Sequence, residues 1–214
     1  MKKLLQITLA LSAVFGALAA QAQDVKVGET KVAMCIGCHG IPGYQASFPE
    51  VHKVPMIAGQ NAKYIVAALQ AYAKGDRKHP TMRGIASSLS DKDMADVAAF
   101  YEQQAKLPAA AESVTAAPAD VAALLTKGAC VSCHGVNFSK PIDPSYPKLA
   151  GQHADYLTVA LKSYKADKTA TVGRSNAIMA GQIKQFSNAE LKVIASYIGS
   201  LPTELATVPQ SKFR

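Results

Sequence analysis

The 214-residue sequence lacks most of the features from which an enzyme, a membrane protein or a nucleic-acid-binding protein is usually predicted. Its scattered Ser, His and Asp residues form no motif for a hydrolytic or nucleophilic centre. There is little strand–helix–strand patterning, which argues against a thioredoxin-like fold. No basic run is interleaved with aromatic residues, so nucleic acid is a poor explanation for the formal net charge of +8. Beyond the N-terminal region, no apolar run is long enough to span a membrane.

Cysteine is also scarce, and its placement predicts the chemistry. All four cysteines lie in two Cys-x-x-Cys-His motifs, at 35–39 and 130–134. Two thiols at this spacing can each add to one vinyl group of a haem, and the adjacent imidazole is then held under the iron. A disulfide, a redox pair or a zinc site does not explain a histidine after both pairs. We therefore predict two covalently bound haem c groups, attached at Cys35, Cys38, Cys130 and Cys133, with His39 and His134 on the irons.

The first residues predict export. Lys2 and Lys3 precede an apolar run over 4–20, and Ala20-Gln21-Ala22 offers a small-x-small cleavage site. An uncleaved anchor is the alternative, but polar residues interrupt the run and its alanine-rich end suits a peptidase better than a bilayer. We expect a signal peptide over 1–22 that is removed, and a soluble protein in the periplasm.

The rest of the chain is one unit written twice. Val-Pro-Met-Ile-Ala-Gly-Gln at 54–60 corresponds to Tyr-Pro-Lys-Leu-Ala-Gly-Gln at 146–152, and a helical pattern follows each. In the first half, Asn61 is the expected N-cap of this helix and Gly75 its stop.

The last helix of each half begins with a capping box, Ser90 with Asp93 and Ser187 with Glu190. Shorter helices are expected before each haem motif, over 28–34 and 120–127, the second capped by Asp120. The alanine-rich stretch 109–119 has no apolar helical face and is expected to be an exposed linker. The sequence thus predicts two all-helical domains, 23–108 and 120–204, and a tail over 205–214.

The repeat also selects the second axial ligand of each iron. Met34, Met56 and Met94 have no methionine counterpart in the second half, whereas Met82 aligns with Met179. Both stand eight residues before a capping serine, in segments that we expect to be irregular and able to fold over the haem. Met82 and Met179 are the predicted ligands, and His79 is kept as a rival in the first half.

These motifs resemble those of the class I cytochromes c, and specifically the di-haem cytochrome c4 family. The likeness covers nearly the whole mature chain: the paired haem motifs, the Pro-Lys-Leu-Ala-Gly-Gln segment with its variant at 55–60, and a methionine followed by a capped terminal helix. The resemblance implies an all-α fold of two tandem class I cytochrome c-like domains, facing each other across a pseudo-twofold axis. It also implies that the carbonyls of Pro55 and Pro147 accept a hydrogen bond from Nδ1 of His39 and His134.

The two haem environments are expected to differ. The loop from His39 to Pro55 is three residues longer than the loop from His134 to Pro147, whereas the second half has five extra residues before Met179. Different surroundings allow different reduction potentials.

The function that follows is an electron carrier in the periplasm, delivering electrons toward a terminal oxidase or a similar acceptor. Two alternatives stay open: the haem subunit of a periplasmic dehydrogenase, and a di-haem peroxidase, which would need a displaceable ligand on one iron. The second half is the more basic one, and a solvated face is the simplest explanation of its charge. A sharper hypothesis is that its lysines steer docking onto an acidic redox partner or an anionic membrane face. They are Lys127, Lys140, Lys148, Lys162, Lys165 and Lys168.

Overall fold

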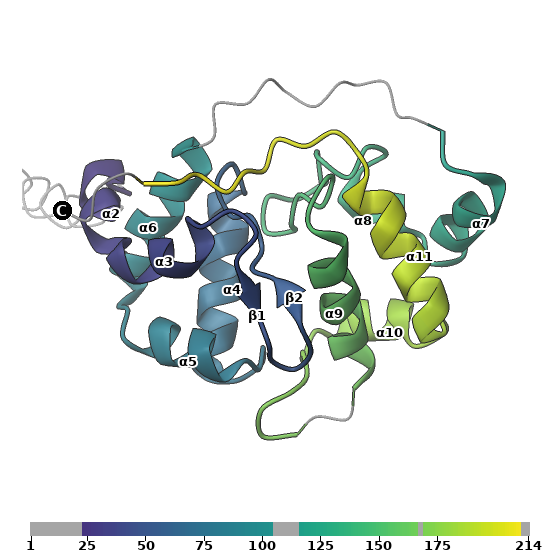
Figure 1. Cartoon of the computed structure of the whole chain (residues 1–214), viewed down its shortest axis with the longest axis horizontal. Coiled ribbons are helices and arrows are strands. Elements are labelled where there is room, and N and C mark those ends of the chain that lie inside the picture. Colours follow the sequence, from purple (N-terminus) through teal and green to yellow (C-terminus); the bar gives the residue numbers. More distant parts are fainter. Residues whose placement is uncertain (1–22, 105–115, 167–168, 211–214) are drawn as a thin grey trace, which may run out of the picture.

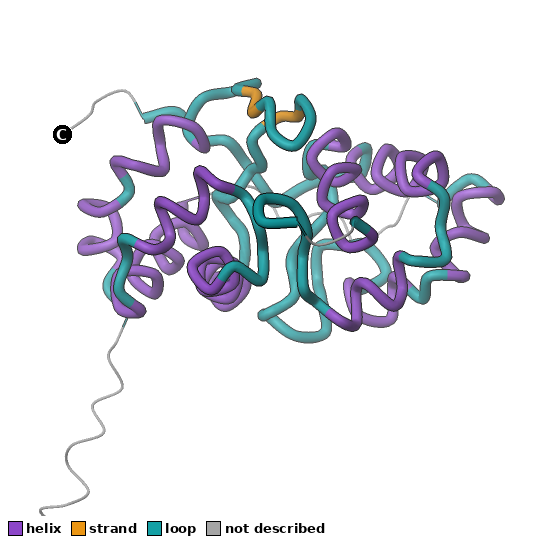
Figure 2. Tube along the Cα trace, turned by 90° about the horizontal axis from the view of Figure 1, so that it is seen from below, coloured by secondary structure: helices purple, strands orange, loops and turns teal. Residues whose placement is uncertain are grey.

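The computed structural model describes residues 23–104, 116–166 and 169–210. The predicted signal peptide and the greater part of the predicted linker lie outside these residues. Two groups of helices, one from each half of the chain, stand at the two ends of the molecule, with loops gathered between them (Figures 1 and 2). The N-terminal half contains α2 Val25–Lys31, α3 Ala33–His39, β1 Gln45–Ala46, β2 His52–Lys53, α4 Ala62–Lys74, α5 Pro80–Ser87 and α6 Asp91–Gln104. The C-terminal half contains α7 Ala119–Lys127, α8 Cys130–His134, α9 Ala154–Lys165, α10 Ala177–Ile183 and α11 Asn188–Gly199.

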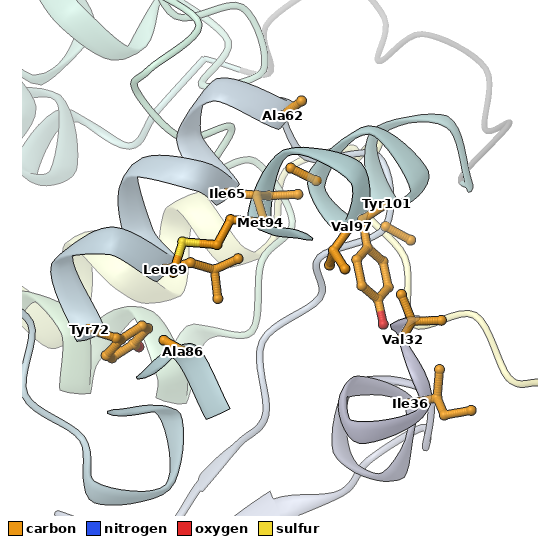
Figure 3. Packing of buried hydrophobic residues seen from close by; sticks show 12 residues of the cluster. Val32, Ile36, Ala62, Ile65, Leu69, Tyr72, Ala86, Met94, Val97 and Tyr101 are labelled. Carbon is orange, nitrogen blue, oxygen red and sulfur yellow. The ribbon is translucent and has the colours of Figure 1, made fainter. Parts of the chain in front are cut away.

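The core of the N-terminal half forms where α4, α6 and the haem-motif helix α3 meet (Figure 3). Ile65 and Leu69 of α4 face Met94 and Val97 of α6, and all four side chains are buried. Since these positions recur at intervals of three or four residues, each helix buries one stripe and exposes the rest. Met94 is therefore a packing residue.

Of the two predicted ends of α4, the stop at Gly75 is confirmed and the side-chain cap by Asn61 is not. The helix stops at Gly75, which adopts φ +81 as expected for a left-handed C-cap. Asn61 stands at the N-cap position, but its side chain does not cap the helix. Its amide instead donates a hydrogen bond to the carbonyl of Tyr146 in the other half, 3.2 Å away.

The helices that precede the haem motifs begin and end elsewhere than predicted. In the first half, Asp24 caps α2 by accepting from the amides of Lys26 and Val27, and the chain bends at Val32 before α3. The single helix predicted over 28–34 is therefore two. In the second half the predicted cap Asp120 is wrong, because α7 already begins at Ala119 after Pro118.

The C-terminal half repeats the arrangement with a core formed between α9, α10 and α11. Leu157 of α9, Ile183 of α10 and Ile194 of α11 are buried in it. The predicted capping box is confirmed at the start of α11, where Ser187 and Glu190 each accept from the other's backbone amide. Ser90 and Asp93 form the same reciprocal pair in the first half.

The tail returns to the N-terminal half. After Leu201 the chain runs back over the top of the molecule in Figure 1, and the amide of Ala206 donates to the carbonyl of Ala58 at 3.0 Å. Leu205 is almost completely buried, and Val208 packs against the core of the N-terminal half. The first residues of the predicted tail thus tie the two halves together.

The longer loop of the first half also reaches across the interface. It contains the antiparallel pair β1–β2, in which Ala46 is opposite His52. From this hairpin, the amide of Lys53 donates to Asp155 Oδ2 at 3.1 Å, and Glu50 pairs with Lys162 of α9. Among the described residues, no helix is both long enough and apolar enough to cross a membrane.

Candidate haem-binding sites

Both haem motifs and both predicted methionine ligands line one cavity of about 810 Å³ that continues from one half into the other. In the N-terminal half the lining includes Cys35, Cys38, His39 and Met82. The C-terminal half contributes Cys130, Cys133, His134 and Met179. The structure therefore places all eight of these residues on the wall of one cavity, and His52, His79, Met34 and Met56 of the first half line it as well.

The two motif histidines are held by the same kind of hydrogen bond. The carbonyl of Pro55 accepts from Nδ1 of His39 at 2.8 Å, and the carbonyl of Pro147 accepts from Nδ1 of His134 at 3.4 Å. These are the two contacts that the family resemblance implied. Each bond fixes the orientation of the ring and leaves Nε2 available to a metal.

Burial keeps both imidazoles neutral. Desolvation lowers the pKa of His39 and of His134, although the hydrogen bond to the proline carbonyl opposes the shift in each case. A neutral imidazole is the form that binds a metal. Burial likewise raises the pKa of the Cys35 thiol to about 11 and raises that of Cys130. A raised thiol pKa is unlike the low pKa of the thiols in redox pairs.

The methionines lie on helices, contrary to the irregular segments that we predicted. Met82 is in the first turn of α5 and Met179 in the first turn of α10. Asn176 caps α10, with its Oδ1 accepting from the Met179 amide at 2.9 Å. In α5 this role falls to His79, whose Nδ1 accepts from the Met82 amide at 3.4 Å. The rival ligand His79 also lines the cavity, but one of its ring nitrogens is engaged in this cap.

Two half-buried arginines between the halves were missed by sequence reasoning. Arg77 and Arg174 pair with each other through their backbones and both line the cavity. Arg77 donates to the hydroxyls of Tyr64 and Tyr156, at 3.1 and 2.6 Å, and its Nε has no hydrogen-bond partner. Among the described residues no carboxylate pairs with either guanidinium. The one available signal was that Arg77 and Arg174 occupy the same place in the repeat, five residues before each methionine.

This cluster suits a haem. Partial burial of two guanidinium groups without a carboxylate partner is costly, and a haem brings carboxylates that arginine binds well. Burial acts to raise the pKa of Tyr156, but the two guanidinium groups outweigh it and lower that pKa to about 8. The local field therefore favours negative charge, as a carboxylate-bearing ligand requires.

Comparison with known proteins agrees with this geometry. A family model described as cytochrome c matches residues 25–104 and again 118–202. Cytochrome c4 of Azotobacter vinelandii is 31% identical over 209 residues, which cover 91% of this chain and 97% of the relative. This chain belongs to the di-haem cytochrome c4 family. Its fold is all-α, with two tandem cytochrome c domains, and its cofactors are two haem c groups.

A solved structure and a second relative are also similar to this chain. The crystal structure of reduced recombinant cytochrome c4 from Pseudomonas stutzeri superposes with a TM-score of 0.60 at 28% identity, covering 84% of this chain and 100% of that one. A protein named thiosulfate dehydrogenase electron acceptor from Stutzerimonas stutzeri is 31% identical over 183 residues, 81% of this chain and 82% of the relative. Cytochromes c4 transfer electrons and are not enzymes, so the peroxidase alternative falls away.

Proposed function

We propose that this cytochrome c4 homologue is a periplasmic carrier that takes electrons from one redox protein and delivers them toward a terminal oxidase or a similar acceptor. In the proposal Cys35, Cys38, Cys130 and Cys133 hold the two haems covalently. His39 with Met82, and His134 with Met179, are the axial ligands. Each bound haem supplies a one-electron centre between the ferric and ferrous states.

The observation that carries the proposal is the continuous cavity, which is lined by His39 and Met82 of the first half and by His134 and Met179 of the second. In the second half these are the only lining histidine and methionine among the described residues. With both axial positions filled, neither iron would offer a site to a substrate. Thioether ligation favours the ferrous state and suits the high-potential end of a respiratory chain.

The protein contributes the environment. It keeps the histidines neutral and oriented, surrounds the site with apolar side chains such as Ile65 and Leu157, and joins the two sites through one interface. A dry, rigid surrounding reduces the reorganisation that accompanies a change of charge, and this favours electron transfer over chemistry.

The test is an optical and redox titration of the purified protein beside two variants. The intact protein should contain two c-type haems and show the weak near-red sulfur-to-iron band. Met82→Ala and Met179→Ala should each remove about half of that band and lower the potential of one haem only. A variant that leaves the band unchanged would remove that methionine from the ligand set.

A second candidate, supported by the thiosulfate dehydrogenase electron acceptor relative, is that the chain receives electrons from a periplasmic dehydrogenase. Copurification of a dehydrogenase that reduces the protein would favour it. We expect electrostatic steering of such a partner to be weak, although Lys168 of the predicted docking face lies outside the described residues. Lys127, Lys148 and Lys162 already pair with Glu190, Glu204 and Glu50, so we expect only a modest fall of the electron-transfer rate with salt.

A further inference from the structure

The interface between the halves contains a reciprocal pair of buried glutamines. Gln60 and Gln152 end the repeated Pro-x-x-Ala-Gly-Gln segments, and each is only 3% exposed. The amide of Gln152 accepts from the Met56 amide at 3.0 Å and donates to the Met56 carbonyl at 2.9 Å. Gln60 makes the same two bonds to Lys148, both at 2.9 Å.

Each glutamine therefore grips the peptide group that orients the histidine of the opposite half. The Pro55 carbonyl that accepts from His39 belongs to the same peptide unit as the Met56 amide that donates to Gln152. In the second half the Pro147 carbonyl and the Lys148 amide form the corresponding unit, which Gln60 holds.

A peptide unit that donates and accepts at once makes stronger bonds than one that does either alone. When another group accepts from the amide N–H, the peptide unit is polarised and its carbonyl oxygen becomes more negative. Such cooperativity strengthens a neighbouring hydrogen bond by roughly 10–30%. The same contact fixes the plane of the peptide, and so the direction in which the carbonyl points. The hydrogen bond to the histidine depends on both.

We propose that Gln152 tunes the haem of the N-terminal half through Met56, Pro55 and His39, and that Gln60 tunes the haem of the C-terminal half through Lys148, Pro147 and His134. The glutamines are positioning residues, and neither touches the axial ligand itself. This inference rests on the proposed function, because it takes His39 and His134 as the iron ligands. Its consequence is that docking of the two halves sets both potentials.

The sign follows from the ligand chemistry. A carbonyl that accepts strongly from Nδ1 makes the imidazole more basic, which favours the ferric iron and lowers the potential. Loss of the glutamine acceptor should therefore raise the potential of the haem in the opposite half. The effect should be larger for the N-terminal haem, because the His39 bond is 2.8 Å long and the His134 bond 3.4 Å.

The experiment compares Gln152→Leu with Gln60→Leu in the full-length haem-loaded protein, with Asn61→Ala as control. Asn61 also donates across the interface, to the Tyr146 carbonyl, but it does not touch either tuned peptide unit. Potentials are measured by spectroelectrochemical titration and assigned to each half from the NMR signals of the haem methyl groups. Q152L should raise only the N-terminal potential, Q60L only the C-terminal one and by less, and N61A neither.

A second readout follows the hydrogen bond directly. In the ferrous protein, solvent exchange of the His39 Nδ1 proton should be several-fold faster in Q152L, with the His134 proton unchanged. Gln152→Glu keeps an oxygen that can accept from the Met56 amide, so it should restore slow exchange at His39. This variant also tests the inference if Q152L does not fold.

Three results would overturn the inference. They are unchanged potentials in both leucine variants, equal shifts of both haems in each variant, as general loosening would produce, and fast exchange in Q152E. If the leucine variants keep two haems and the near-red band but show no change of potential in the opposite half, the tuning is contradicted and the proposed function is not. A protein without methionine-ligated haems contradicts the proposed function instead.

Discussion

The helix that precedes the haem motif is built differently in the two halves. In the N-terminal half α2 and α3 are separated only by Val32, and α2 buries Gly28 against the backbone of α6. In the C-terminal half Gly128 and Ala129 interrupt the chain before α8, and Ala129 adopts φ +47. This left-handed residue changes the direction of the chain between α7 and α8.

The two helices consequently bury different faces. Counted back from the first motif cysteine, Gly28 corresponds to Ala123, yet Gly28 is buried and Ala123 is exposed. α7 instead buries Val121 and Leu125 against the C-terminal core. The same repeat therefore reaches a closed domain by a backbone contact in one half and by apolar side chains in the other.

A buried charge accompanies the backbone contact. Asp96 of α6 has no exposed surface and accepts from the Asp24 amide, Lys31 and Lys92. Its counterpart in α11, Val193, is 41% exposed. A buried charge thus helps to hold the terminal helices together in the N-terminal half, whereas α7 and α11 are joined by the partly exposed pair of Lys127 and Glu190.

The largest expected effect comes from replacing Gly28 by Ala. An added Cβ would lie 2.1 Å from the Asp96 carbonyl oxygen, and backbone cannot move aside as a flexible side chain can. We expect a loss of about 3 kcal/mol, at the upper end for overpacking. Hydrogen exchange with mass spectrometry should show the loss in α2 and α6 and leave α7 and α11 protected.

The matched control is Ala123→Gly. Ala123 is exposed, so the change should cost only the helix propensity of alanine, about 1 kcal/mol, and only within α7. Equal losses from the two substitutions would mean that the halves are closed in the same way, against the contrast drawn above.

Much of this fold could be predicted because the repeat compares two copies of every position. Two methionines at one offset marked Met82 and Met179, which both line the cavity, and two serine–acid pairs marked the starts of α6 and α11. Helix ends were harder to predict, because Asn61 and Asp120 both suit an N-cap in sequence and neither side chain caps its helix. The Asn61 side chain bonds to Tyr146 in the other half instead, and α7 begins before Asp120, directly after Pro118.

The interface could not be predicted, since its residues look ordinary within their own halves. Gln60 and Gln152 stand at the ends of the repeated segments, and Arg77 and Arg174 belong to no motif. Their hydrogen-bond or backbone-bridge partners include residues of the opposite half, so their role depends on a pairing that a single copy of the repeat does not encode. The matching position of each pair in the repeat was the available signal.

The next largest effect should be a difference between the two halves in their stability toward acid. The pKa of Asp96 is lowered by the hydrogen bond from the Asp24 amide and then by Lys92 and Lys31, with burial opposing. A carboxylate with a depressed folded pKa stabilises fully above its unfolded pKa, about 3.9, and loses this contribution as pH falls toward the folded pKa. The N-terminal half should therefore open first on acidification.

Asp96→Asn tests this directly. The variant should be less stable than the intact protein near neutral pH, and its stability should vary less with pH below about pH 4. Urea unfolding followed by far-UV circular dichroism at several pH values measures both. Parallel stability curves for the two proteins would show that Asp96 is not the source of the acid sensitivity.

The smallest expected difference concerns the caps of the two methionine helices. Removing a good N-cap costs about 1 kcal/mol, which corresponds to roughly a fivefold change in a local opening equilibrium. The Asn176 bond to the Met179 amide is 2.9 Å long, whereas the His79 bond to the Met82 amide is 3.4 Å. With Met179 and Met82 as the proposed iron ligands, Asn176→Ala should speed displacement of Met179 by added imidazole about fivefold. His79→Ala should change the rate for Met82 less than twofold. If the His79 variant had the larger effect, His79 would stabilise α5 mainly through its ring contact with Phe48 rather than through the cap.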